Sequence, residues 1–356
     1  MKRYPFLDWL RGLAVLLMIP CHTFNSYTRL DLRESGPYVL SQFIGGMAAP
    51  LFLFMAGMTM GFQIESPGRR WIDAFRRGAF VLGIAFLFRI SNYGFSLPNA
   101  DWHEITKVDI LNCMGVAIMF FSPVARIEPC LRTRFALAGG LAIAAAAPLI
   151  ANLDWTRAPL LLHDYLAPSP GTGRFAFFPY AAYVGFGLAS GITVKRSTEP
   201  RFDRLMQWLV LVGFSLIGGG RYFASLPYSI YTKSDFWTDS PALVLIRFGI
   251  CLVLMAGAYL WTEYCAGAGW SWMQALGRNS LMVYWVHVVL VYGDTTRKIQ
   301  RGLSIPQTAL ATFVVIVLMA GLSAAWLAWK RRRRRPPSSA GTPAADSSPA
   351  TSSRSA

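Results

Sequence analysis

Apolar residues dominate this chain in long runs separated by short polar connections. Runs of about 17 to 25 apolar residues are the length that crosses a bilayer as a helix. The pattern therefore predicts an all-α fold, a polytopic transmembrane bundle of about ten helices. The ten runs lie near residues 6–27, 39–62, 75–96, 108–125, 135–152, 175–193, 205–222, 241–262, 271–292 and 308–329.

Arginine and lysine concentrate in alternate connections, which indicates how the chain is oriented. The connections after the second, fourth and sixth runs are each rich in positive side chains. Because cytoplasmic loops are enriched in Lys and Arg, these connections and both termini are predicted to be cytoplasmic. The connection with Arg297, Lys298 and Arg301 conflicts with this topology, because it would lie outside. The predicted localisation is the inner (cytoplasmic) membrane, with several passes.

The first run, FLDWLRGLAVLLMIPCHTFNSY, carries polar residues on one side. Asp8, Arg11, His22 and Asn25 are separated by helical spacings, so they share one face. Arg11 and His22 lie about 16 Å apart along the axis, at about 1.5 Å per residue. An ionisable group at membrane depth costs about 2.5 kcal/mol or more, so it normally faces a cavity or another polar group. This stripe is therefore a candidate functional face.

Composition supports the membrane assignment. The 356 residues are 54% hydrophobic and 15% charged, with a mean hydropathy of +0.39, which excludes an ordinary soluble domain. The net charge of +16 does not indicate nucleic-acid binding, because Lys330–Arg335 reads as a cytoplasmic stop sequence. The five cysteines lack metal-ligand spacing, so no metal site is predicted. We expect a transmembrane domain over 1–330 and a basic stop sequence with a disordered tail over 331–356.

Depth assigned from the topology brings polar residues of five runs to one level. Three pairs within single runs are three residues apart and share a face. The sequence therefore predicts a polar pocket that opens toward the outer side. Its expected members are His22, Asn25, Arg89, Asn92, Asp109, Asn112, Arg247, Tyr284 and His287.

A histidine near a carboxylate is a common arrangement for general-base catalysis. Arg89 and Arg247 suit an anionic acceptor or a developing oxyanion. The sequence has no glycine-rich phosphate loop, nucleophile elbow, zinc-binding His-Glu pattern or kinase signature. Hydrolase, kinase and metalloenzyme functions therefore have no support.

Several stretches carry a resemblance to known membrane enzymes. FLDWLRGLAVLLMIPCH, with ten residues between its Arg and its His, resembles the first-helix motif of acyltransferase family 3. Four further stretches are similar to bacterial relatives of the heparan-α-glucosaminide N-acetyltransferase catalytic domain. They are APLFLFMAGMTMGF from Ala49, KVDILNCMGVA from Lys107, RFAFFPYAAYVGFGLASG from Arg174 and LGRNSLMVYWVH from Leu276.

The resemblance implies transfer of an acetyl or short acyl group from cytoplasmic acyl-CoA to an acceptor across the membrane. It gives His22 the catalytic role and places Arg11 near the acyl-CoA entrance. No cofactor is expected to be bound permanently, since acyl-CoA, acetyl-CoA above all, is a co-substrate. The outer loops are short, so a glycan or small molecule is expected as acceptor, without implying heparan.

Roles follow for the remaining candidates. His22, Asp109 and His287 are the predicted catalytic residues. Arg11 and the cluster after the second run are expected to bind the phosphates of acyl-CoA. The cluster contains Arg69, Arg70, Arg76 and Arg77. The predicted substrate-binding residues are Asn25, Arg89, Asn92, Asn112, Arg247 and Tyr284.

Other interpretations stay open at this point. A transporter would use the same polar layer to bind a solute, although paired interrupted helices are not seen. A non-catalytic lipid-binding or scaffold protein would leave the buried charges unexplained. Arg11 can simply pair with Asp8, and Arg89, Arg247 and Asp109 can form a structural ion network. His22 and His287 can each be buried structural histidines.

Overall fold

The computed structural model describes residues 4–95, 103–168, 175–197, 199–266 and 271–334, and within these residues it contains helices and no β-strand. The first seven helices are α1 (Pro5–Tyr27), α2 (Gly36–Gly45), α3 (Ala48–Ile64), α4 (Trp71–Phe95), α5 (His103–Thr106), α6 (Ile110–Phe121) and α7 (Pro129–Ala151). The others are α8 (Leu160–Leu166), α9 (Phe177–Arg196), α10 (Glu199–Ala224), α11 (Pro241–Leu260), α12 (Trp272–Arg278), α13 (Ser280–Tyr292) and α14 (Ile305–Arg334).

The predicted all-α class is confirmed, and each apolar run coincides with a helix or a pair of helices. The count of ten membrane crossings is not confirmed. Within the described residues, six segments are long and apolar enough to cross a membrane. Helices α6 and α13 are shorter, and α4 and α10 are long but more polar. The six segments are Pro5–Tyr27, Gly36–Ile64, Pro129–Ala151, Phe177–Arg196, Pro241–Cys265 and Ile305–Arg333.

Helix α9 is the most enclosed of these segments and packs along α3. Of its most apolar 18-residue stretch, 83% is buried. A Cβ atom on Gly187 would collide with the backbone carbonyl of Phe54 on α3. Small residues that allow this approach are typical of helix contacts in membranes. Together α3 and α9 form the centre of the large hydrophobic core.

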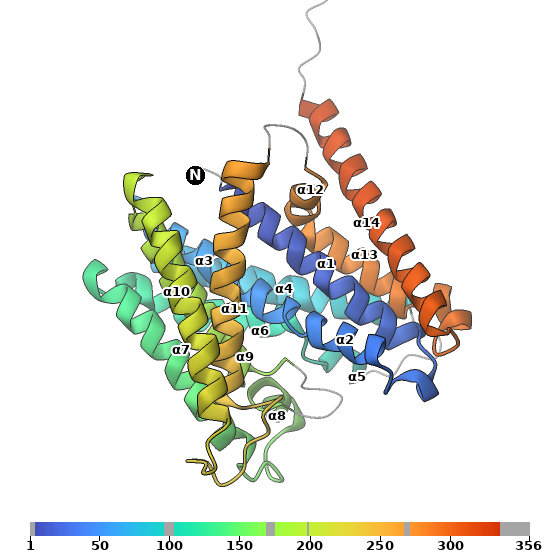
Figure 1. Cartoon of the computed structure of the whole chain (residues 1–356), viewed down its shortest axis with the longest axis horizontal. Helices are drawn as coiled ribbons and strands as arrows, with labels where there is room; N and C mark the ends of the chain where they lie inside the picture. The colour runs from blue at the N-terminus through green and yellow to red at the C-terminus, as the bar shows by residue number, and fades with distance from the viewer. Residues whose placement is uncertain (1–3, 96–102, 169–174, 198, 267–270, 335–356) are drawn as a thin grey trace, which may run out of the picture.

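Helix α1 is held on its other side by α12, α13 and α14 (Figure 1). A Cβ atom on Gly277 of α12 would collide with the carbonyl of Asp8, so the two backbones touch. The hydroxyl of Thr23 lies 2.6 Å from that of Thr312 on α14. Ser26 donates a 2.8 Å hydrogen bond to the carbonyl of Val291. These contacts fix the register of the second half of α1 against α13 and α14.

One end of the bundle collects the start of α1 and the ends of α3, α9 and α11. The rings of Tyr4 and Phe62 lie 4.9 Å apart, and Phe6 contacts Tyr259 at 6.1 Å. We call this the basic end, defined by the side chains Arg11, Arg77, Arg132, Arg196, Arg278 and Lys330.

Glu65 ties three helices together at the basic end. It follows α3 and accepts hydrogen bonds from Arg132 of α7 at 3.0 Å and from Arg196 of α9 at 2.8 Å. Burial by itself raises the pKa of Glu65, but the hydrogen bonds from Arg196 and Arg132 outweigh burial, so the pKa lies below its usual value.

We expect Glu65→Gln to lower the free energy of unfolding by about 1 to 3 kcal/mol at pH 7. A lowered pKa means that the ionised carboxylate stabilises the folded chain above the unfolded pKa and that this stability is lost as the pH falls. The difference between wild type and variant should therefore shrink below about pH 4. Thermal unfolding of the detergent-solubilised protein from pH 3 to 7 measures it. Exposed Glu128→Gln is the control, and an equal loss there would contradict the assignment.

Candidate functional site

Two histidines from distant parts of the sequence meet inside the bundle. Nδ1 of His22 on α1 lies 2.9 Å from Nε2 of His287 on α13. The rings are nearly parallel, with centroids 5.1 Å apart. His287 is fully buried, and its Nδ1 lies 2.8 Å from the carbonyl oxygen of Val283, one turn earlier on α13.

This geometry determines the tautomer of each neutral ring. A carbonyl oxygen only accepts, so Nδ1 of His287 carries the hydrogen and Nε2 carries the lone pair. His22 must then donate from Nδ1 to that lone pair, which leaves the lone pair of His22 on Nε2. The carbonyl of Val283 therefore orients His22 through His287, and Nε2 of His22 is the atom able to accept a proton or attack a carbonyl carbon.

Two tyrosines of α13 extend this pair in opposite directions. The ring of Tyr292 lies 5.6 Å from His22, and its hydroxyl donates to the side-chain oxygen of Asn25 at 3.2 Å. The ring of Tyr284 lies 5.9 Å from His287. The predicted residues His22, Asn25, Tyr284 and His287 are thus neighbours.

Arg89 of α4 and Asp109 before α6 form an ion pair, with Nε and Oδ2 3.2 Å apart. Neither of these two atoms forms a hydrogen bond, so the contact is mainly coulombic. Asp109 also caps α6, and its backbone N–H donates to Asn112. Asn112 donates to the hydroxyl of Tyr165 at 2.9 Å. The structure therefore supports the ion-network interpretation for Arg89 and Asp109.

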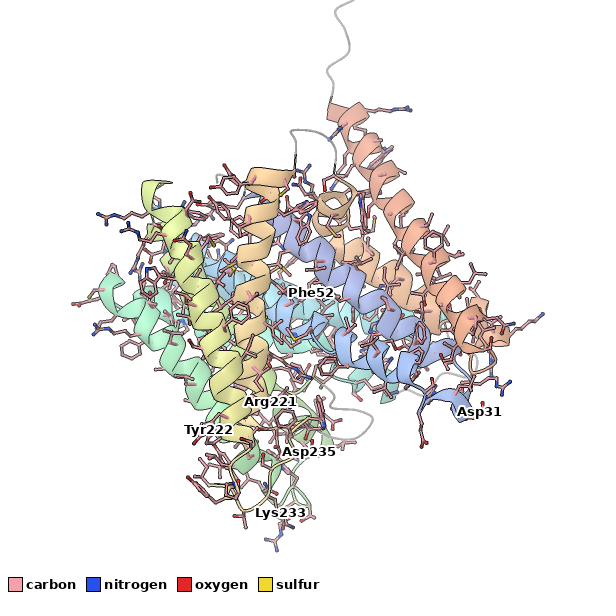
Figure 2. All side chains as sticks on the ribbon, viewed as in Figure 1. Asp31, Phe52, Arg221, Tyr222, Lys233 and Asp235 are labelled. Atoms are coloured by element: carbon pink, nitrogen blue, oxygen red, sulfur yellow. The ribbon has the colours of Figure 1, made fainter. Side chains whose placement is uncertain are left out.

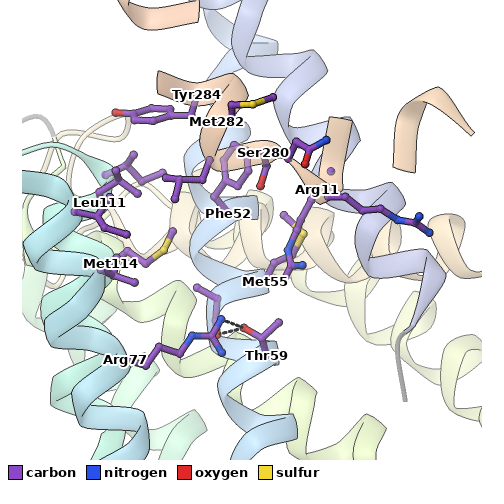
Figure 3. A pocket seen from close by; sticks show the side chains of 18 of the residues that line it. Arg11, Phe52, Met55, Thr59, Arg77, Leu111, Met114, Ser280, Met282 and Tyr284 are labelled. Atoms are coloured by element: carbon purple, nitrogen blue, oxygen red, sulfur yellow. Dashed lines mark hydrogen bonds between the residues drawn. The ribbon is translucent and has the colours of Figure 1, made fainter. Parts of the chain in front are cut away.

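A cavity of about 480 Å³ leads inward from the basic end. Among the described residues, four basic side chains line it: Arg11, Arg77, Arg278 and Lys330. Helices α3, α4 and α6 contribute most of the apolar residues of its wall, among them Met55 and Met114. Figure 3 shows Tyr284 at the opposite end of this cavity from Arg77, which contacts Thr59.

The cavity ends next to the histidine pair without including it. Tyr284 lines the inner end, and its ring contacts both Phe88 of α4 and His287. Arg77 and Phe88 are separated by eleven residues, or about 16 Å of helix. The same spacing separates Arg11 from His22 on α1. A ligand held at the basic end would therefore have to reach about three turns to meet the histidines.

Other predicted site residues lie elsewhere. Arg69, Arg70 and Arg76 are exposed and do not line the cavity. Arg247 lines a different cavity, so it is not part of the ion pair of Arg89 and Asp109. Asn92 is half-buried one turn after Arg89. Of the neighbouring residues Arg76 and Arg77, only Arg77 therefore lines the cavity.

Arg11 has both of the contacts that the sequence left open. Its guanidinium lies 3.7 Å from Asp8, and it lines the cavity. Asp8 is almost completely buried and also meets Arg278 at 3.3 Å. The carboxylate therefore holds two of the four cationic side chains at the cavity mouth.

Sequence reasoning missed Arg278, Lys330 and Tyr165 as site residues. Arg278 occurs within the LGRNSLMVYWVH stretch, where only the tyrosine and histidine were assigned. The sequence places Lys330 only in the predicted stop sequence. Tyr165 lies on α8, outside every predicted membrane crossing. The family-like stretch that contains Arg278 could have identified this residue from the sequence, whereas nothing in the pattern indicated that Lys330 or Tyr165 belongs to the site.

The architecture defines a class: a helical membrane protein with a polar site inside the bundle and a basic cavity leading to it. The family model "Heparan-alpha-glucosaminide N-acetyltransferase, catalytic" matches residues 3–225 of this chain. The chain belongs to this family, which supports a membrane acetyltransferase over a transporter. No curated protein matches the chain. The resemblance to acyltransferase family 3 stays a prediction.

The matched range covers only part of the site. It includes His22, Arg77 and Asp109 but ends before α11. His287 and Arg278 belong to the remainder of the chain. One member of the histidine pair, His22, therefore lies inside the range that carries the family assignment, and the other, His287, lies outside it.

We expect Asp109→Asn to destabilise the fold by about 3 kcal/mol or more, because it leaves Arg89 without its counter-charge while Asn still caps α6. The double variant Arg89→Gln, Asp109→Asn should recover much of that loss. Thermal unfolding of the purified protein measures both. A double variant no more stable than Asp109→Asn would contradict a structural ion pair.

Proposed function

We propose that the chain transfers an acetyl or short acyl group from acyl-CoA, chiefly acetyl-CoA, to a hydroxyl or amine acceptor on the other side of the membrane. The observation that carries this proposal is the cavity, which has four basic side chains at one end and, at the other, Tyr284 beside the paired histidines. Family membership supports the acetyl group as cargo.

The cavity suits the donor in both charge and shape. The phosphates of acetyl-CoA are anionic, and guanidinium and ammonium groups bind such oxygens through charge-assisted hydrogen bonds. Arg11, Arg77, Arg278 and Lys330 supply them. The narrow pantetheine arm would extend along Met55 and Met114 toward Tyr284. Exposed Arg69, Arg70 and Arg76 would attract the polyanion from a distance.

His22 would act through Nε2. As the acceptor oxygen or nitrogen attacks the thioester carbonyl, Nε2 takes the acceptor's proton; the C–S bond then breaks, and the proton passes to the departing thiolate. His287 accepts the Nδ1 hydrogen bond of His22 throughout and so stabilises the protonated ring. The alternative is an acetyl group carried briefly on Nε2, which gives the same overall balance.

The orientation follows from the donor. Acyl-CoA is cytoplasmic, so the basic end would face the cytoplasm, with both termini on that side and the chain in the inner membrane. The acceptor, a glycan or small molecule, would approach from the other end, past Tyr292 and Asn25. The amide and the hydroxyl there are suited to sugar hydroxyls.

We expect His22→Ala to reduce acetyl transfer by about 10²- to 10⁴-fold, because the proton acceptor is lost. The measurement is transfer of labelled acetyl from acetyl-CoA to the glycan fraction of membranes that contain the protein. Acetyl-CoA affinity should be unchanged. Transfer at the wild-type rate would remove His22 from the mechanism.

His287 should act as a positioning residue, which two variants distinguish. His287→Gln places a carbonyl oxygen near the position of Nε2 and still accepts from His22, whereas His287→Leu removes the acceptor. We expect kcat of the Gln variant to exceed that of the Leu variant by about tenfold, with similar KM for acetyl-CoA. Equal kcat values would indicate a merely structural histidine.

Arg77→Ala should weaken acetyl-CoA binding by about tenfold or more, since a charge-assisted contact is lost. Arg76→Ala, one residue earlier on the same helix, is the matched comparison because its side chain lies outside the cavity. Calorimetric titration of the purified protein with acetyl-CoA gives both dissociation constants. An equal loss in both variants would mean that the whole basic cluster binds the donor, as the sequence alone predicted.

A further inference from the structure

A second cavity lies on another side of the bundle and has no role in the proposed acetyl transfer. It measures about 780 Å³ and lies between α2, α10 and α11. Helix α11 packs against α10 and lies between it and α2 (Figure 1). One end is bordered by Trp237, whose ring contacts Phe43 of α2 at 6.1 Å. We call this cavity the lateral groove.

The lateral groove is apolar along most of its length. Helix α11 contributes Ile246, Ile250 and Leu254, which are spaced to lie on one helical face. Its α2 bank is formed by Val39 and Phe43, which are 53% and 62% exposed. Such exposed apolar side chains on a membrane helix face lipid. The groove therefore opens onto the lipid-facing surface of the bundle.

Two arginines lie along this surface, between its Trp237 end and the turns of α11 that carry Ile250 and Leu254. Arg221 of α10 and Arg247 of α11 both line the groove. A Cβ atom on Gly220 would contact Ala242 and Ile246, which places the two arginines within about one turn of each other along the helix pair. Figure 2 shows Arg221 in the last turns of α10, beside the loop that carries Lys233.

Neither arginine has a counter-charge in the part of the chain that the structure describes. No carboxylate there forms an ion pair with Arg221 or Arg247. The polar neighbours of Arg247 include the Tyr180 and Tyr183 hydroxyls, which are neutral. A cation without a counter-charge is costly at a membrane-facing site. An external anion would relieve this cost.

We propose that the lateral groove binds an anionic glycerophospholipid, with its phosphate between Arg221 and Arg247 and one acyl chain along α11. From Arg247 to Leu254 the helix offers about 10 Å of apolar wall, at about 1.5 Å per residue. A guanidinium group can donate two parallel hydrogen bonds to the oxygens of one phosphate, so Arg221 and Arg247 suit the phosphate of a lipid head group. An acyl chain matches the remainder of the groove, which a soluble phosphate would leave empty.

The chain offers a matched pair of variants to test the site. Gly218 lines the groove, and a Cβ atom there meets nothing within 4 Å. Gly219 is equally open but does not line it. Both sit in the same helix, so leucine at either position changes helix propensity alike. Gly218→Leu would fill the groove, whereas Gly219→Leu would not.

The purified full-length protein in detergent is titrated with phosphatidylglycerol, and bound lipid is counted by native mass spectrometry. We expect Gly218→Leu and the double variant Arg221→Gln, Arg247→Gln each to weaken phosphatidylglycerol binding by about tenfold or more. Gly219→Leu should bind it as the wild type does. Wild type should prefer phosphatidylglycerol to zwitterionic phosphatidylcholine. Thermal unfolding confirms that each variant is folded.

Two results would overturn the proposal. Undiminished phosphatidylglycerol binding by folded Gly218→Leu would place the lipid outside the groove. Displacement of phosphatidylglycerol by an equal concentration of inorganic phosphate would show that the acyl chain contributes nothing. Neither result depends on acetyl transfer, so the two proposals fail separately.

Discussion

Ionisable side chains inside an apolar bundle must be paired or must line a cavity, and this constraint organises the protein. Asp8 is paired with Arg11 and Arg278, Asp109 with Arg89, and His22 with His287. The contacts of Asp109 with Arg89 and of His22 with His287 each join different helices. Asp8 joins α1 to α12 through Arg278. Lipid offers no alternative partner, so losing one member of a pair leaves the other as an uncompensated polar or charged group in an apolar environment, which is energetically costly. The polar contacts therefore specify which helix faces meet, while glycine contacts such as Gly277 against Asp8 set how closely they meet.

The histidine pair is a contact of this kind to which the proposed mechanism gives a chemical role. Because Val283 can only accept from His287, the protonation of both rings is set by one backbone carbonyl. The outer contacts of α1, through Thr23 and Ser26, hold the two rings in register. A base held in one tautomer by its surroundings needs little reorganisation when it takes up a proton. In the proposed mechanism the structural and catalytic interpretations of His287 are compatible, since the residue would act by fixing the orientation of His22.

Arginines in this bundle divide by what neutralises them. Arg89 has Asp109, Arg132 and Arg196 share Glu65, and each of these is a closed structural contact. Among the described residues, Asp8 pairs with Arg11 and Arg278 of the basic cavity, and the set of four cations there suits a soluble polyanion in the proposed function. Arg221 and Arg247 line the lateral groove and, in our proposal, suit an anion attached to an acyl chain. The same residue type therefore occurs in three kinds of surroundings, and the roles that we propose for it follow from those surroundings.

The sequence alone determined the helical class, the position of each apolar run and the polar stripe of α1. Its motifs also indicated membership of the heparan-α-glucosaminide N-acetyltransferase family. These depend on local periodicity and on hydropathy, which each segment carries within itself. The tertiary structure alone decided that His22 meets His287, that Arg77 rather than Arg76 lines the cavity with Arg278 and Lys330, and that Arg247 lies apart from Arg89. Periodicity states which residues share a face, but which helix that face meets depends on packing between segments up to 265 residues apart.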